Sequence, residues 1–298
     1  MGNVFFTVDI GNTRTKFYVW DSASPDVPFD EFVDLSVSYE EASRWFGRLL
    51  GEQTGKVRWF ISSVNSRKSE ALKSLLANSR PNDVVKFATL DDLPMTFQYD
   101  RPEKLGLDRA IDAYAGAKVL GDGRPFLVVD VGTAATIDYV DSRGVFRGGA
   151  ILPGARLMAE SLERNTASLP MLDDPENEWF TKFSSKSSRD FLTYPATETR
   201  RGMRVGIVFA LIGAIVAFYW KTRRTILEED EDPDCLTLLL AGGDAAFTKF
   251  NLVNYFDDLE SSLNLSAPRP EIIEAPFLTA IGLREIAIAS GFIVLNNR

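Results

Sequence analysis

Asp9-Ile10-Gly11-Asn12-Thr13 joins two apolar runs with the composition of strands, residues 4–8 and 16–20. A carboxylate at the end of a strand, followed by a glycine turn and small polar residues, lets backbone N–H groups face an anion. The same arrangement recurs where residues 126–129 lead into Asp130-Val131-Gly132-Thr133-Ala134-Ala135-Thr136. Two such turns, each opening a comparable half of the chain, indicate a duplicated α/β unit that binds a nucleotide between its halves.

The composition is that of a globular protein with room for two domains. The chain has 298 residues, of which 45% are hydrophobic and 25% charged. A formal net charge of −9 argues against a surface that follows nucleic-acid phosphates, although a local basic pocket stays open. We therefore expect small-molecule substrates and no nucleic-acid partner.

Histidine is absent from the chain, which removes Ser-His-Asp catalysis, histidine general bases and histidine zinc sites. The one cysteine, Cys235, lies in an apolar run, and we expect it to be a packed core thiol. Any chemistry must then rest on carboxylates, Lys and Arg side chains, hydroxyls, backbone N–H groups and bound cations.

The longest apolar stretch, residues 205–220, falls short of the roughly 20 residues that a membrane span needs. Gly206 and Gly213 interrupt it, so we expect a buried helix and no membrane contact. The N-terminus shows no basic segment followed by an apolar one, which is the pattern of a signal peptide. These observations predict a cytoplasmic protein.

Hydrophobic periodicity predicts three strands followed by alternating helices and strands in each half, which is a mixed α/β sheet. In the first half the predicted strands are residues 4–8, 16–20, 29–37, 57–61 and 84–87, and the predicted helices 39–50, 66–76 and 110–119. In the second half the strands are 126–130, 134–140, 145–151 and 236–240, and the helices 155–162, 198–227 and 275–289. Residues 173–194, which are charged and Ser-rich, are expected to form an exposed loop.

Asp9 is placed to hold Mg²⁺ against nucleotide phosphates, directly or through water. A turn in which the Asp side chain bonds its own backbone is the alternative. Asn12, Thr13 and Lys16 would add donors for phosphate oxygens, although Lys16 also fits a solvated strand position.

The second turn offers a comparable set of oxygens. Asp130 with Thr133 and Thr136 suits a hard cation or phosphate, and a buried, hydrogen-bonded turn is the alternative. The glycine-rich run 148–154 lets the backbone pass close to a ligand or to a partner strand. The pair 242–243 either admits adenine or ribose or forms a tight turn between a strand and a helix.

Asp108-Arg109 stands at a predicted helix N-terminus, where the dipole favours a carboxylate or a bound anion. Asp108 has the chemistry to accept a proton from a substrate hydroxyl, and Arg109 to clamp a carboxylate or a transferring phosphoryl group. An N-cap Asp followed by a solvated Arg is the alternative.

Taken together, these residues resemble the type III pantothenate kinases, members of the actin-like, sugar-kinase and Hsp70 ATPase superfamily. The resemblance is collinear over nearly the whole chain. The motifs that carry it are Asp9-Ile10-Gly11-Asn12-Thr13, Tyr99-x-x-Pro102-x-x-Leu105-Gly106-x-Asp108-Arg109, Asp130-x-Gly132-Thr133-Ala134-x-Thr136-x-Asp138, Gly148-Gly149-x-Ile151-x-Pro153-Gly154, Thr166-Ala167-x-Leu169-Pro170 and Gly242-Gly243-Asp244.

The resemblance implies a duplicated ribonuclease H-like (actin-like ATPase) fold of two similar α/β domains, each a mixed five-stranded sheet flanked by helices. We expect the domains to be residues 1–120 and 121–298, with the long helix 198–227 serving in dimerisation. The resemblance also implies a homodimer whose pantothenate pocket is completed across the interface.

The implied activity is ATP-dependent phosphorylation of the terminal hydroxyl of pantothenate, giving 4'-phosphopantothenate, the first step toward coenzyme A. Mg²⁺ would accompany the nucleotide, and K⁺ or NH₄⁺ would be the monovalent cation. By motif position the resemblance implies the following roles: Asp108 as general base; Tyr99, Gly106, Leu107, Arg109 and Thr199 at pantothenate; Asp9, Ile10, Gly11, Asn12, Thr13, Arg14, Thr15, Lys16 and Thr133 at ATP; Asp130 at the monovalent cation; and Asp9 at Mg²⁺ through water.

Thr199 stands where the chain departs from the family pattern. The family commonly shows a Gly-Lys-Asn-Thr-like approach there, whereas this chain has Tyr194-Pro195-Ala196-Thr197-Glu198-Thr199, so Thr197 is an alternative. Two rival functions also remain. One is a superfamily kinase or phosphatase acting on a sugar or polyphosphate, against which the motif 99–109 argues. The other is a non-enzymatic nucleotide-binding regulator, against which the full set of carboxylates argues.

Overall fold

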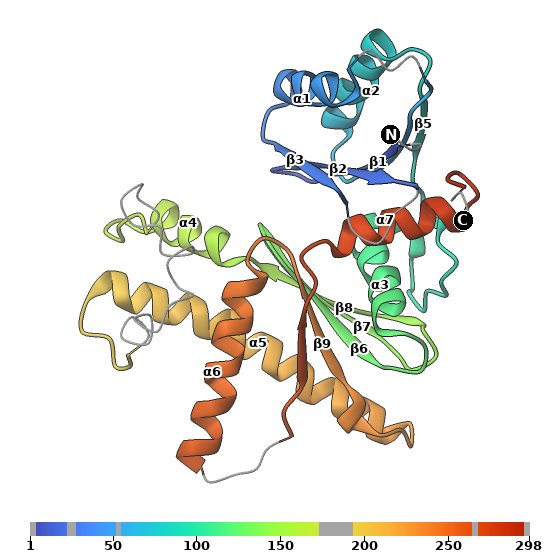
Figure 1. The fold of residues 1–298 in the computed structure, drawn as a ribbon. Coiled ribbons are helices and arrows are strands. Elements are labelled where there is room, and N and C mark those ends of the chain that lie inside the picture. The colour runs from blue at the N-terminus through green and yellow to red at the C-terminus, as the bar shows by residue number, and fades with distance from the viewer. Residues whose placement is uncertain (1–3, 23–27, 52–54, 173–192, 264–267, 295–298) are drawn as a thin grey trace. The chain divides into compact units, whose positions relative to one another are not determined.

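Two mixed five-stranded sheets form the framework of the chain in the computed structural model (Figure 1). The structure describes residues 4–22, 28–51, 55–172, 193–263 and 268–294, with the backbone alone at 261–263. All but the last two positions of the expected loop 173–194 lie outside these residues. The chain divides into two compact units, Met1–Leu120 with Phe277–Arg298, and Gly121–Pro276.

The first unit begins with an antiparallel meander and continues with alternating helices and strands. Its strand order is β3-β2-β1-β4-β5, with β1 antiparallel to β2 and parallel to β4. The elements are β1 (Val4–Ile10), β2 (Thr15–Asp21), β3 (Asp30–Asp34), α1 (Glu40–Leu50), β4 (Arg58–Ser63), α2 (Ser66–Ser79), β5 (Val84–Phe87), α3 (Leu107–Leu120) and α7 (Leu278–Ala289).

Successive side chains of β1 point to opposite faces of this sheet, and different helices pack on the two faces. Phe6, Val8 and Ile10 enter a core with residues of α1 and α2 such as Trp45 and Leu72. The opposite face, to which Asp9 belongs, is covered by α3 and α7, which pack against β4 and β1 (Figure 1). The sheet therefore turns Asp9 toward the side of the unit that carries α3.

The second unit repeats the first in chain order. Its sheet has the order β8-β7-β6-β9-β10, so in both sheets the third strand of the unit is followed by the second, first, fourth and fifth. The expected duplication is confirmed. The elements are β6 (Phe126–Val131), β7 (Ala134–Val140), β8 (Phe146–Pro153), α4 (Ala155–Asn165), α5 (Thr199–Glu228), β9 (Thr237–Ala241), α6 (Ala245–Leu263) and β10 (Glu271–Glu274). The periodicity gave no prediction for α6 and β10.

The end of the chain departs from the expected second domain of residues 121–298. Residues from Phe277 onward group with the first unit, where α7 packs against α3. A Cβ at Gly282 of α7 would lie 2.7 Å from Ile111 Cγ2 of α3, which shows how closely the two helices approach. The small residue at this crossing explains why the closing helix packs on α3.

α5 has 30 residues, and it is long and apolar enough to cross a membrane by length and composition, with a mean hydropathy of 2.0 over 18 residues. Half of that window is buried. Leu211 and Ile215 join the core of the second unit with Leu238 of β9. The expected buried helix is therefore confirmed for one face only, because Phe209 on the other is 52% exposed.

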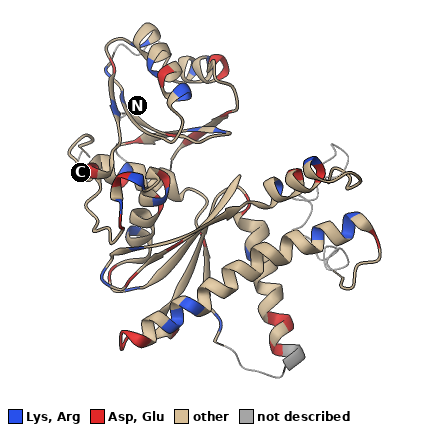
Figure 2. Cartoon of the chain, turned by 180° about the vertical axis from the view of Figure 1, so that it is seen from behind, with Lys and Arg blue, Asp and Glu red and all other residues tan. Residues whose placement is uncertain are grey.

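Basic residues mark both ends of α5, and its middle carries none (Figure 2). The basic residues are Arg200, Arg201 and Arg204 at the start and Lys221, Arg223 and Arg224 near the end.

The expectation that Cys235 is a packed core thiol was wrong, since this thiol is exposed. It lies in a short 3₁₀ turn before β9 rather than in the strand itself.

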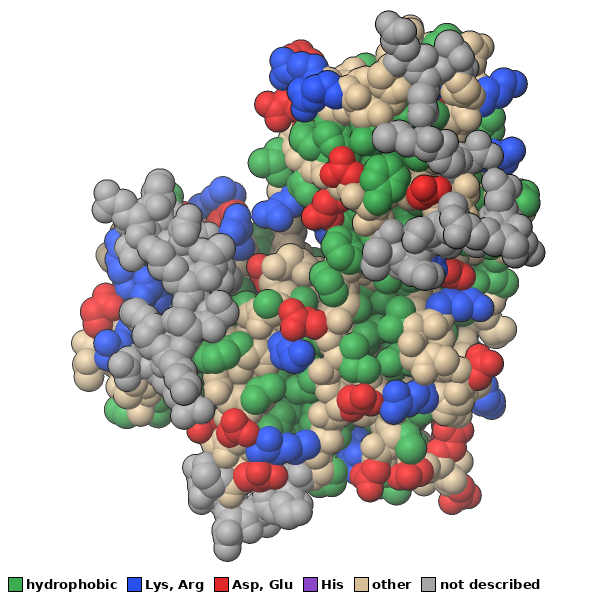
Figure 3. All heavy atoms as spheres, in the orientation of Figure 1, with side chains coloured by type: hydrophobic (Ala, Val, Ile, Leu, Met, Phe, Trp, Pro, Cys, Tyr) green, Lys and Arg blue, Asp and Glu red, His purple; other side chains and the backbone are tan. Residues whose placement is uncertain are grey.

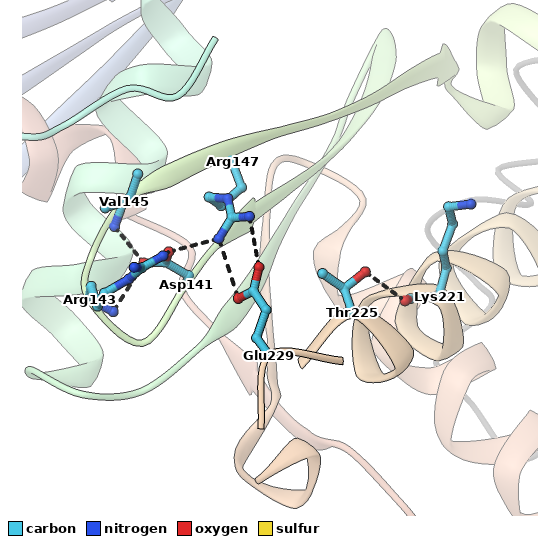
Figure 4. Close-up of polar contacts among 7 residues, drawn as sticks. All are labelled: Asp141, Arg143, Val145, Arg147, Lys221, Thr225 and Glu229. Atoms are coloured by element: carbon cyan, nitrogen blue, oxygen red, sulfur yellow. Dashed lines mark hydrogen bonds and ion pairs between the residues drawn. The ribbon is translucent and has the colours of Figure 1, made fainter. Parts of the chain in front are cut away.

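The predicted turn between β7 and β8 is held by a buried carboxylate (Figure 4). Asp141 accepts hydrogen bonds from Arg143 and from Arg147, whose Nη1 lies 3.1 Å from Asp141 Oδ2. Arg147 also pairs with Glu229 at the end of α5, at 2.9 Å. Burial alone would raise the pKa of Asp141, but the bonds from Arg143, the Val145 N–H and Arg147 outweigh burial and lower this pKa.

Candidate active site

The first turn, residues 11–14, connects β1 to β2. The Gly11 N–H donates to the Arg14 carbonyl at 2.9 Å, which closes the turn. The side chains of Asn12, Thr13 and Arg14 are exposed. The turn thus presents an amide, a hydroxyl and a guanidinium to solvent directly beside a carboxylate, which is the set expected to meet nucleotide phosphates.

Asp9 lies at the base of this turn, directly opposite Lys16 in the β1–β2 register. Ser62 Oγ of β4 donates to Asp9 Oδ1 at 3.1 Å. Burial raises the pKa of Asp9, the Lys16 charge and the Ser62 hydrogen bond act against it, and the Asp108 charge raises it further. A carboxylate whose charge is only partly compensated by its neighbours fits a bound hard cation, so this donor is consistent with the expected Mg²⁺ role.

Asp108 and Arg109 lie inside the first turn of α3, because the helix begins at Leu107, three residues before its predicted start. Asp108 Oδ1 accepts the Arg109 N–H at 2.9 Å, and a Cβ at Gly106 would lie 2.6 Å from that oxygen. Asp108 is half-buried, whereas Arg109 is 7% exposed. The alternative of an N-cap Asp followed by a solvated Arg does not describe this arrangement.

Asp108 and Asp9 lie in the same unit, close enough for the Asp108 charge to act on Asp9. They come from different elements, α3 and β1, and the Asp108 charge acts on the pKa of Asp9. The two residues are about a hundred positions apart in the sequence, and their motifs alone do not predict that they interact. Two carboxylates on the same side of one sheet are an arrangement that phosphoryl transfer to a hydroxyl can use.

The second turn, residues 132–134, separates the paired residues Val131 and Ala135 and is one residue shorter than the first, although its last residue, Ala134, already pairs with β8 as the start of β7. The Gly132 N–H donates to the Ala134 carbonyl at 2.9 Å, as Gly11 does in the first turn. The Gly154 N–H donates to the Thr133 carbonyl at 3.0 Å. A Cβ at Gly154 would lie only 1.9 Å from the Gly132 carbonyl oxygen, so the end of β8 is pressed against the turn.

Asp130 ends β6 beside a second close approach. Gly242, after β9, has φ +87°, and a Cβ there would lie 2.3 Å from Asp130 Oδ1. The pair 242–243 therefore forms the tight turn that was one of its two expected roles. The glycine run likewise admits a partner strand, because a Cβ at Gly149 would lie 2.1 Å from the Ile137 carbonyl oxygen of β7.

The oxygens around Asp130 fit a monovalent cation better than a transition metal. No group of three or more His, Cys, Asp or Glu side chains that could hold a metal occurs within the residues the structure describes. Asp130 pairs in the β6–β7 register with Thr136, and the Thr133 hydroxyl belongs to an exposed residue next to Gly132. One carboxylate with hydroxyls and carbonyls is a donor set for a hard cation of low charge.

Two residues of the expected ATP site point away from the turn. Ile10 has no exposed surface and belongs to the core with α1 and α2, and the Thr15 hydroxyl lies 3.0 Å from Tyr39 Oη in the same interior. Neither Ile10 nor Thr15 has exposed surface with which to meet a ligand. Of the expected pantothenate residues, Tyr99 is half-buried ahead of α3 in the first unit, and Thr199 begins α5 in the second.

An apolar groove that the sequence did not predict lies between α4 and α5. Thr199 is part of its wall, together with small residues of α5 spaced four apart. The lining residues are Pro153, Leu157, Met158, Ser161, Leu162, Leu169, Thr199, Gly202, Met203, Gly206, Ile207 and Ala210. The small residues at helical spacing are the feature of the sequence from which this groove could have been found.

The strand order, the duplication and the two turns define the class of the protein as a duplicated ribonuclease H-like ATPase fold of the kind found in sugar kinases. A solved structure of a Listeria monocytogenes protein proposed to be an N-acetylmannosamine kinase covers 97% of this chain and 99% of its own, with a TM-score of 0.51 and 13% identity. At that identity the likeness shows the fold alone.

The particular family follows from sequence. The model of the type III pantothenate kinase family matches residues 5–221, and the chain belongs to this family. A type III pantothenate kinase of Persephonella marina is 31% identical over 268 residues, 86% of this chain and 94% of that protein. A second, from Rhodopirellula baltica, is 34% identical over 156 residues, and the match spans 52% of this chain and about half (53%) of that relative.

Proposed function

We propose that this protein transfers the γ-phosphoryl group of ATP to the terminal hydroxyl of pantothenate, giving 4'-phosphopantothenate in the first step of coenzyme A synthesis. Membership of the type III pantothenate kinase family supports the substrate pair. The observation that carries the chemistry is the position of Asp108 in the first turn of α3, where its charge reaches Asp9.

Asp108 acts as general base in this proposal. The pantothenate hydroxyl oxygen forms a bond to the γ-phosphorus, the bond from that phosphorus to the bridging oxygen of ADP breaks, and the hydroxyl proton passes to the Asp108 carboxylate. A carboxylate is the available base, because the chain contains no histidine. In a loose transition state the proton leaves late, so positioning and charge neutralisation contribute most of the rate.

Cationic groups of the chain offset the charge of the phosphates. Lys16 and Arg14 belong to β2 and to the first turn, and Asn12 and Thr13 add neutral donors. Asp9 would hold Mg²⁺ through water. When bound with ATP, this ion would supply electrostatic stabilisation of the transferring phosphoryl group. We place K⁺ or NH₄⁺ at Asp130 with Thr133 beside it, where it balances the nucleotide charge without redox or acid chemistry.

The pantothenate site in this proposal is built around the start of α3. Tyr99, Gly106 and Leu107 line it, and Arg109 pairs with the pantothenate carboxylate, for which a buried guanidinium is well suited. By motif position the family resemblance also assigns Thr199, or Thr197 as the alternative, to pantothenate.

We propose that the protein is a homodimer assembled through α5. Beside the buried side of this helix lies an exposed side on which Phe209 is 52% and Trp220 37% exposed, next to the groove with α4. Such an apolar surface is typical of a protein interface. Light scattering should give twice the chain mass, and Ala210→Arg in the groove should give a monomer, whereas Val253→Arg on α6 should not.

The proposed substrates and location agree with the charge distribution. Figure 3 shows acidic and basic side chains interspersed on the face in view, which fits small anionic substrates better than a nucleic acid. We expect the protein in the cytoplasm without a membrane partner. After cell fractionation it should appear in the supernatant without detergent, and recovery only with membranes would contradict this expectation.

The experiment that tests the function is ADP release with ATP and Mg²⁺, with and without pantothenate, in K⁺ and then in Na⁺. Turnover should require pantothenate and be faster in K⁺, and mass spectrometry should find the phosphorylated product. ATP hydrolysis independent of pantothenate, or no turnover in K⁺, would refute the proposal in favour of another superfamily phosphotransferase or a nucleotide-binding regulator.

A further inference from the structure

Lys68 is a buried lysine that the catalytic argument does not use. It lies in the first turn of α2 and is 4% exposed. Its Nζ donates to the backbone carbonyl of Thr13, in the first turn, at 3.0 Å. Lys68 forms no direct ion pair among the described residues, although the charge of the buried Asp34 acts on it. Burying an ammonium is unfavourable, which makes the hydrogen bond to the Thr13 carbonyl informative.

Hydrogen bonds at the start of α2 hold Lys68 beside the first turn. Asn65 caps α2, and its Oδ1 accepts the Lys68 N–H at 3.1 Å. The Val64 N–H donates to the Ile10 carbonyl at 3.0 Å, which ties the end of β4 to the end of β1 just before the first turn. The helix start and the turn are thus connected at two places, through backbone at Ile10 and through the Lys68 side chain at Thr13.

The contact also determines which way the turn's amides face. In a trans peptide the carbonyl of one residue and the N–H of the next point in opposite directions. When Lys68 holds the Thr13 carbonyl, the direction of the Arg14 N–H is therefore fixed as well. Side-chain burial keeps Lys68 itself from solvent, so its effect on a ligand is exerted through the turn.

We propose that Lys68 is a positioning residue for the nucleotide: by holding the Thr13 carbonyl it keeps the first turn in the conformation whose N–H groups receive the ATP phosphates. This inference rests on the proposed function for the identity of the ligand. It predicts an effect on nucleotide affinity that is separate from pantothenate affinity and from the proton transfer at Asp108.

The variants that test it are Lys68→Met, which keeps the length of the side chain but removes the donor, and Lys68→Arg, which retains a cationic donor. Lys73→Met is the matched control on the same helix, because Lys73 is exposed and pairs only with Glu70 among the described ion pairs. ADP and a non-hydrolysable ATP analogue are titrated into each full-length protein by calorimetry, and KM for ATP, KM for pantothenate and kcat are measured beside them.

For Lys68→Met we expect the dissociation constant of both nucleotides and the KM for ATP to rise about tenfold, the usual effect of losing a charge-assisted hydrogen bond. KM for pantothenate should change by less than about twofold on the same reasoning. Lys68→Arg should recover most of the affinity, and Lys73→Met should behave as wild type. A Lys68 with a merely structural role would lower the melting midpoint without this split between the two KM values.

Unchanged nucleotide affinity in Lys68→Met would overturn the inference, and so would an equal rise of both KM values. Failure of the proposed function looks different. A wild-type protein that binds nucleotide but does not phosphorylate pantothenate would refute that function, and the comparison of nucleotide affinities would still decide the role of Lys68.

Discussion

The two glycine turns, one in each unit, have the same strand context but are held in place by different means. In the first unit the turn 11–14 is exposed at three of its side chains and is tied from one side by a polar contact, Lys68 Nζ to the Thr13 carbonyl at 3.0 Å. In the second unit the turn 132–134 also has exposed side chains, but backbone packs directly against its carbonyls: Gly154 lies so close to the Gly132 carbonyl, and Gly242 to the Val131 carbonyl just before the turn, that neither has room for a Cβ. The conformation of the first turn thus depends on a side-chain hydrogen bond, whereas that of the second depends on backbone packing.

A second difference follows the fifth strand of each sheet. Both β5 and β10 lead onward to a helix, α3 and α7, and both helices belong to the first unit. The first turn of α3 contains Asp108, whereas the first turn of α7 contains no acidic residue. Each half therefore has a turn preceded by a carboxylate, but only one of these two helices has an acidic residue in its first turn, so the two halves differ in chemistry.

The largest effect should come from removing that base. Asp108→Asn keeps the shape of the side chain but cannot accept the hydroxyl proton, so we expect turnover to fall by about two to four orders of magnitude with nearly unchanged ATP affinity. Steady-state kinetics with pantothenate, together with a nucleotide titration, measure both quantities. Asp91→Asn, at an exposed position of the same unit, is the control. Near-normal turnover in Asp108→Asn would remove Asp108 from the role of base.

The next effect compares the two turns directly. Gly154→Ala would place a Cβ 1.9 Å from the Gly132 carbonyl oxygen, whereas Gly11→Ala would place one 3.1 Å from the Arg14 carbonyl oxygen. We expect the first variant to lower the free energy of unfolding by about 2–4 kcal/mol and the second by about 1 kcal/mol or less, because the first requires a large backbone shift, whereas the second requires the Arg14 carbonyl to give way only slightly. Urea denaturation measures both, and equal losses would contradict the difference between a packed and an open turn.

The sequence predicted these turns well because their residues are local. The glycine between two strands, the carboxylate before it and the matching order of elements in both halves all lie within short windows of the sequence. What could not be predicted depends on contacts far apart in the chain. α7 belongs with the first unit because Gly282 meets Ile111, and Cys235 is exposed because the chain makes a 3₁₀ turn before β9 begins.

Lys68 shows the same limit for the candidate site. At helical spacing in a polar segment it has the pattern of a solvated surface residue, and only the fold reveals that it is buried against the first turn. The roles carried by the family resemblance are local motif assignments too, so they could name Asp9 and Asp108 but could not say that their charges interact.

A smaller effect concerns the buried carboxylate of the second unit. Asp141 has a fully buried side chain compensated by two arginines, of which Arg147 is itself 19% exposed (Figure 4). Arg147→Met should lower the free energy of unfolding by about 1–3 kcal/mol at neutral pH, because a buried charge loses a donor. Arg224→Met breaks an exposed pair with Glu228 and should leave the stability nearly unchanged. Equal behaviour of these two variants would contradict the importance of burial.

The pH dependence of Asp141 has a definite sign. Its pKa is lowered in the folded chain, so its stabilising contribution is present above the usual pKa of an aspartate and is lost as the pH falls through the folded value. The difference between wild type and Arg147→Met should accordingly narrow in acid. Asp9 is the contrasting carboxylate of the first unit, since burial raises its pKa instead.

The smallest predicted effect follows from that contrast. Because the pKa of Asp9 is raised, the unfolded chain releases this proton at a lower pH than the folded one, and the free energy of unfolding decreases as the pH rises between the two values. Asp9→Asn removes the charge and keeps an acceptor for Ser62, so we expect a higher melting midpoint than wild type at pH 7 without nucleotide, with the difference shrinking toward pH 4. The same variant should lose activity with Mg²⁺ and ATP, because it lacks the carboxylate charge proposed to hold the cation. Wild type would then keep this charge for function at the expense of stability. Thermal melts of both proteins across this pH range measure the effect, and a lower midpoint for Asp9→Asn at pH 7 would show that the carboxylate is fully compensated within the fold and has no charge left over for a cation.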